Sequence, residues 1–87
     1  MTTKAPPAVE ESPANSIEKI AYASVAEIPT EEPNDRNRLG YHIWRWLSNR
    51  QGTLESAVAE SGSRIHISRR EAVDIIRAEL KKHGIAE

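Results

Sequence analysis

The sequence contains no cysteine, which excludes a disulfide framework and a thiolate metal site. It also lacks a long apolar run, because no stretch approaches the roughly 20 residues that a helix needs to span a bilayer. Residues 2–13 lack the apolar segment of a signal peptide. From these absences we expect a cytoplasmic protein without a membrane partner.

Groups that support catalysis or metal binding are also scarce. The three histidines, His42, His66 and His83, lie on three separate expected elements, without the spacing of a metal site. The chain has no glycine-rich phosphate loop and no activated-serine motif. We therefore expect no catalytic residue, no metal ligand and no cofactor, and we do not expect an enzyme.

What the sequence does contain is a division of charge between its two parts. Residues 1–35 carry seven acidic and two basic side chains, a net charge of -5, and include all five prolines. Residues 36–87 carry ten lysines and arginines against six acidic side chains, a net charge of +4, and include all four glycines. A chain of 87 residues has room for one small domain. The division predicts an acidic, proline-rich arm over 1–35 and a basic domain over 36–87.

The arm has little to bury. Residues 1–15 are mostly Ala, Pro and Glu, so we predict that they are disordered. The secondary structure of residues 16–28 is ambiguous. The apolar spacing of Ile17, Ile20 and Val25 fits a weak helix, but the stretch also tolerates a short strand. We favour the helix, either folding on a partner or lying loosely against its own domain.

Three helices are expected in the basic domain. The first, over 36–49, is capped by Asn34 or Asp35, and its Gly40 is typical of close approach by a neighbouring backbone. The second begins after Thr53 and ends at Gly62. Residues 64–67 alternate polar and apolar side chains, which suits a short strand or an extended link. The fold class is therefore mainly α, a small three-helix domain preceded by a disordered acidic arm.

The last helix is the best-defined element. Ser68 and Glu71 form the pattern of a capping box, in which each side chain accepts from the amide of the other residue. Gly84 follows the last turn, as expected at a helix end. The apolar stripe consists of Ala72, Val73, Ile76 and Leu80. We predict a helix over 69–83 with a basic outer side.

Basic side chains and small polar groups recur on the first and last of these helices. Arginine forks and a helix amino terminus suit phosphate oxygens and guanine edges, so the pattern indicates nucleic-acid binding. An ordinary solvated helix surface is the alternative. The candidate residues are Arg38, His42, Arg45, Arg64, Ser68, Arg69, Arg70, Arg77 and Lys81.

Trp44 lies away from the centre of the apolar stripe of the first helix. It either covers the edge of a small core or marks a dimer or ligand surface. A core of about 50 residues without disulfide or metal is near the lower limit of independent stability. We therefore expect a homodimer or a bound partner.

The runs IWRWLSNRQGTLESAVAESG and ISRREAVDIIRAELKKHGI resemble the three-helix core of winged-helix and helix-turn-helix regulators. The resemblance covers Leu39 to Ile85. It implies that the last helix is the recognition element, with Ser68, Arg69, Arg70 and Asp74 on the side that faces the groove. The turn before this helix is longer than in the family.

The sequence thus predicts a small DNA-binding accessory or regulatory protein, for instance a transcriptional regulator of a mobile element, whose partner is double-stranded DNA. The alternative is a protein-interaction module, an adaptor or an inhibitor of a larger machine, whose basic face and Trp44 meet an acidic protein.

Overall fold

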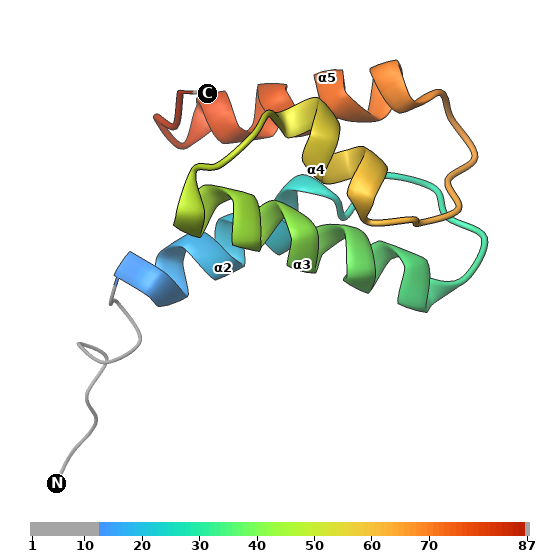
Figure 1. Ribbon diagram of the computed structural model, residues 1–87, viewed down its shortest axis with the longest axis horizontal. Helices are drawn as coiled ribbons and strands as arrows, with labels where there is room; N and C mark the ends of the chain where they lie inside the picture. The colour runs from blue at the N-terminus through green and yellow to red at the C-terminus, as the bar shows by residue number, and fades with distance from the viewer. Residues whose placement is uncertain (1–12, 87) are drawn as a thin grey trace, which may run out of the picture.

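The structure is a computed structural model that describes residues 13–86 (Figure 1). These residues form the helices α2 (Pro13–Ser24), α3 (Pro33–Asn49), α4 (Leu54–Glu60) and α5 (Arg69–Lys82). The mainly α fold class is confirmed. The disorder predicted for 1–15 falls almost wholly on residues outside the described part, since only its last three residues belong to α2.

The helices pack as two opposed pairs. Both α2 and α4 pack against α3 and against α5. Figure 1 shows α4 in front, between α3 and α5, and α2 behind them. The short helix α4 therefore lies on the opposite side of the domain from α2.

The apolar core is shared by all four helices and the turn after α2. Ala21, Val25 and Ile28 are fully or almost fully buried in it. The weak helix favoured for 16–28 thus begins and ends earlier than predicted, at Pro13 and Ser24, and it is part of the fold, so the folded unit starts well before residue 36. The apolar stripe of this helix does not show whether it packs in the core of its own domain, because the same stripe fits a helix that binds a partner. The core consists of Ala21, Val25, Ile28, Leu39, Ile43, Trp46, Leu47, Leu54, Ala57, Val58, Ala72, Val73, Ile76 and Leu80.

Gly40 allows α2 and α3 to approach closely. A Cβ at Gly40 would overlap the ring of Tyr22, at 2.7 Å from Cε1. The neighbour that requires the glycine is thus an aromatic side chain of α2, where the sequence predicted a backbone.

The beginning of α3 differs from the prediction. The helix starts at Pro33, with Glu32 as its N-cap, whereas the sequence placed the cap at Asn34 or Asp35. Proline at the first helical position has no amide that could be left unpaired there, and Asp35 Oδ2 accepts from the Glu32 amide at 3.1 Å. Asp35 therefore lies inside the first turn, where its carboxylate is buried.

Residues 64–67 form an extended link and no strand. Within the described residues, an isolated antiparallel bridge pairs Thr30 with Ile65. The Glu31 amide donates to the Arg64 carbonyl and the His66 amide donates to the Pro29 carbonyl, both at 2.9 Å. This bridge ties the loop before α3 to the loop before α5.

The ends of α5 agree largely with the sequence. Ser68 Oγ accepts from the Glu71 amide at 3.0 Å, and Gly84 has a φ of 76°. The second bond of the predicted capping box, in which the Ser68 amide would donate to the Glu71 carboxylate, does not occur among the residues described. In that same part of the chain no helix combines the length and apolar character needed to cross a bilayer.

Candidate nucleic-acid interface

Basic side chains of two rows, one on α3 and one on α5, line hollows on either side of α4. The α3 row consists of Arg38, His42 and Arg45, and the α5 row consists of Arg69, Arg70, Arg77 and Lys81. His42 and Arg45 line a hollow whose other wall is α4. Most of the α5 row lines a second hollow, which it shares with Glu55 of α4. Basic side chains that are far apart in sequence thus lie on opposite sides of the same short helix.

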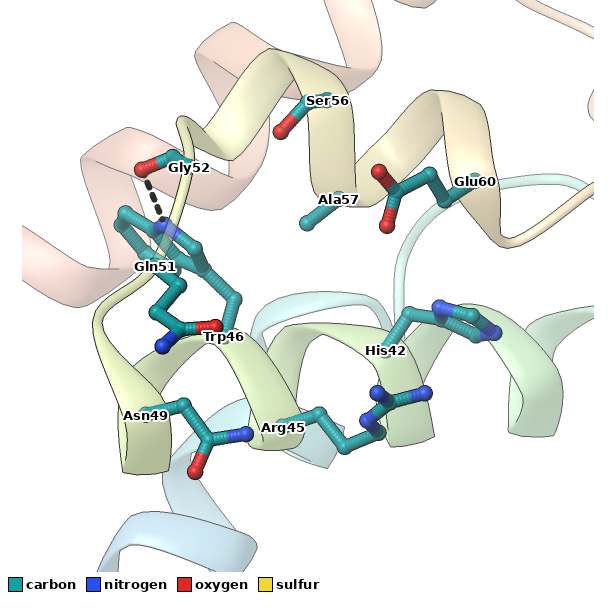
Figure 2. Close-up of a pocket in the computed structure, with 9 residues that line it drawn as sticks. All are labelled: His42, Arg45, Trp46, Asn49, Gln51, Gly52, Ser56, Ala57 and Glu60. Carbon is teal, nitrogen blue, oxygen red and sulfur yellow. Dashed lines mark hydrogen bonds between the residues drawn. The ribbon is translucent and has the colours of Figure 1, made fainter.

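The hollow between α3 and α4 has a volume of about 260 Å³ (Figure 2). Trp46 lines one end of it, beside Gly52 (Figure 2), and its Nε1 donates to the Gly52 carbonyl at 3.1 Å. Figure 2 shows Asn49 and Arg45 projecting from α3 on one side, with Glu60 projecting from α4 on the other. The full lining is His42, Arg45, Trp46, Asn49, Gln51, Gly52, Ser56, Ala57 and Glu60.

The hollow between α4 and α5 has a volume of about 500 Å³. An ion pair of 3.1 Å between Arg77 and Glu55 crosses it, and Arg77 also pairs with Asp74 at 3.2 Å. Arg69 and Arg70, at the amino-terminal end of the same wall, are exposed and form no ion pair with any described residue. Their guanidinium groups are therefore available to an anionic ligand.

Arg38 and Arg64 meet at the buried carboxylate of Asp35. Arg38 Nη1 lies 3.2 Å from Oδ1 and Arg64 Nη2 lies 3.3 Å from Oδ2. Burial by itself raises the pKa of Asp35, but hydrogen bonds from Arg64 and the Glu32 amide, with the charge of Arg64, hold it below its ordinary value of 3.8. Asp35 thus stays ionised and neutralises much of the positive charge there.

Of the other predicted residues, Ser68 caps a helix, whereas Lys81 and Arg64 are exposed. Ser68 uses its hydroxyl to cap α5 and so fixes the start of that helix. Lys81 is exposed and continues the α5 row. Arg64 lies in the loop before α5, outside both rows, and its side chain is 65% exposed.

Trp44 is half-buried and packs against the core, as the first of its two predicted readings requires. Its Nε1 is buried without a hydrogen-bond partner among the described residues. The exposed large aromatic side chain is Tyr41, which lies against Trp44 with ring centroids 5.7 Å apart. Arg45 Cζ lies 6.0 Å from the centre of the Tyr41 ring.

The polar side chains that complete the two hollows were not predicted from the sequence. Glu55 and Glu60 project from α4, and Asn49 and Gln51 lie near the end of α3. Helical spacing shows which residues share one side of a helix but not which neighbour they face. Among the described residues no group of three or more His, Cys, Asp or Glu side chains is arranged to hold a metal ion.

In comparisons with protein-family models, curated proteins and solved structures, none matched this chain.

Proposed function

We propose that this domain binds double-stranded DNA through the side on which α4 lies between the two basic rows. The observation that supports the proposal is the placement of both rows beside one helix. Basic residues that are merely solvated have no reason to lie on both sides of one helix. The two backbones of a duplex, in contrast, present phosphates along two lines, which two rows of cations can match.

The length and availability of the rows fit phosphate contacts. The α5 row extends from Arg69 to Lys81, about 18 Å along the helix axis at 1.5 Å per residue. Arg69, Arg70 and Lys81 are exposed, as is Arg45 across α4. Each such cation that neutralises a phosphate releases counterions, which favours binding at low salt.

The proposal can be tested by fluorescence anisotropy of a labelled, random-sequence duplex at about 50 mM salt. Arg45→Glu and Arg70→Glu each change the net charge by two and should weaken binding about tenfold or more, because each replaces a phosphate contact by a repulsion. Lys19→Glu makes the same charge change on the exposed side of α2 and should have little effect. Absence of binding by the unaltered protein, or an equal effect of Lys19→Glu, would overturn the proposal.

A regulatory role, such as transcriptional control of a mobile element, follows only if binding is selective. Titration at several salt concentrations separates the phosphate contribution from the remainder. Replacing Arg70 by alanine should reduce the slope of log K against log salt by about 1.

A second candidate function is protein interaction, favoured by the exposure of Tyr41. This side chain is 43% exposed and is the large hydrophobic residue left outside the core in the described part of the chain. With Trp44 beneath it and Arg45 beside it, it has the composition of an interface centre. An acidic protein or a second copy of the chain would be the partner. Sedimentation of the unaltered protein and of Tyr41→Ser tests self-association, and partner binding through Tyr41 should depend weakly on salt.

A further inference from the structure

The exposed side of α4 forms a ridge between the two hollows. Leu54, Ala57 and Val58 bury the inner side of the helix, while Glu55, Ala59 and Glu60 are exposed. The two hollows lie along its flanks, with the α3 row beyond one and the α5 row beyond the other. The surface is therefore raised and acidic in the middle and basic on both sides.

This relief is complementary to that of a DNA major groove. A groove is a depression about 12 Å wide between two negative backbones. With phosphates along both flanks of α4, the helix lies along the groove, and its diameter of about 10–12 Å with side chains fits that width. Phosphates placed against the outer walls of the hollows meet the cations of both rows, whereas a backbone laid across α4 would meet two carboxylates.

From this arrangement we infer that α4, in place of α5, enters the major groove of the bound duplex, and that Glu60 makes binding selective for G·C pairs. The inference rests on the proposed function. It assigns α5 a role in phosphate contact, whereas the helix-turn-helix resemblance assigns base contact to that helix.

Glu60 is the more available of the two carboxylates. Glu55 is held by Arg77 at 3.1 Å, whereas Glu60 forms no ion pair with the described residues. Figure 2 shows the Glu60 carboxylate on the flank of α4 that faces His42. In the major groove a carboxylate accepts a hydrogen bond from the cytosine N4 amino group. The adenine N6 amino group is also a donor but lies at a different position across the groove, and thymine presents an acceptor and a methyl group.

Photo-crosslinking tests which helix enters the groove. The chain has no cysteine, so a single introduced thiol can be labelled specifically with an azidophenacyl group. Ala59→Cys on α4 and Ala78→Cys on α5 both replace exposed alanines. The label at position 59 should crosslink to bases of the duplex and the label at position 78 should not. Base crosslinks from position 78 alone, or from neither position while the labelled protein still binds, would overturn the inference.

Competition between duplexes tests the role of Glu60. The unaltered protein should bind an alternating G·C duplex several times more tightly than an alternating A·T duplex. Glu60→Ala should remove this preference, while Glu55→Ala should keep it. Both changes remove one negative charge, so both should tighten binding to the A·T duplex at low salt. Equal affinity of the unaltered protein for the two duplexes would overturn the inference and leave the proposed function intact, whereas failure to bind either duplex would overturn the proposed function itself.

Discussion

Asp35 and Arg64 form an ion pair of 3.3 Å that joins the first turn of α3 to the loop before α5. The carboxylate is completely buried, while the arginine side chain is 65% exposed. The hydroxyl of Ser63 donates to the Asp35 carbonyl at 2.7 Å, so the same loop is held twice. Because this loop positions Ser68 and hence the start of α5, the pair controls the placement of the α5 row.

The stability that Asp35 contributes should disappear in acid. Its pKa in the folded protein is below 3.8, so the unfolded chain binds a proton at a higher pH than the folded protein does. The contribution is therefore complete above the ordinary pKa and is lost as pH falls below 3.8 through the folded-state pKa. Asp35→Asn should lower the melting temperature by several degrees at pH 7, and the difference from the unaltered protein should shrink below pH 3.8. Urea unfolding over this range measures it, and a difference that stays constant with pH would contradict the assignment.

The sequence predicted the helices with long apolar stripes, because such spacing allows few other structures. α3 and α5 were located from Leu39, Ile43, Ile76 and Leu80, all of which are buried. The charge division of the sequence predicts a separate acidic arm and basic domain. In the structure, however, Asp35 from the acidic part is buried against arginines of the basic part. The pair of Asp35 with Arg64 joins residues far apart in sequence and follows from packing alone. The two hollows beside α4 could not be predicted either, because they too are formed by residues that only packing brings together.

Gly40→Ala should destabilise the protein although alanine is the better helix former. The propensity difference favours alanine by about 1 kcal/mol, but the overlap with the Tyr22 ring should cost about 1–3 kcal/mol. In a Tyr22→Ala background the overlap is absent, so the same change should become stabilising by up to about 1 kcal/mol. Urea unfolding of the four proteins in this double-mutant cycle measures both values. If the effect of Gly40→Ala has the same sign in both backgrounds, α2 and α3 do not meet at this contact.

The two tryptophans should respond differently to replacement by phenylalanine. Trp46 Nε1 donates to the Gly52 carbonyl at 3.1 Å, whereas Trp44 Nε1 is buried without a partner in the described part of the chain. Trp46→Phe removes a hydrogen bond and Trp44→Phe removes an unpaired donor, so Trp46→Phe should cost about 1–3 kcal/mol more. The comparison is matched because both changes delete the same atoms. An equal cost would mean that Trp44 donates to an acceptor after all, and a concentration-dependent melting temperature would place that acceptor on a second copy.

Ile28→Ala should destabilise the domain as strongly as Ile76→Ala. Ile28 follows α2 and Ile76 lies in the middle of α5, and both side chains are completely buried in one core. Truncating a buried isoleucine costs about 2–5 kcal/mol, depending on how far the surroundings collapse. A loosely attached segment around residues 16–28 would instead make Ile28→Ala nearly neutral while Ile76→Ala stayed severe. Thermal and urea unfolding of the two variants, with Lys19→Ala as an exposed control on α2, decides between a core that includes α2 and one that begins at α3.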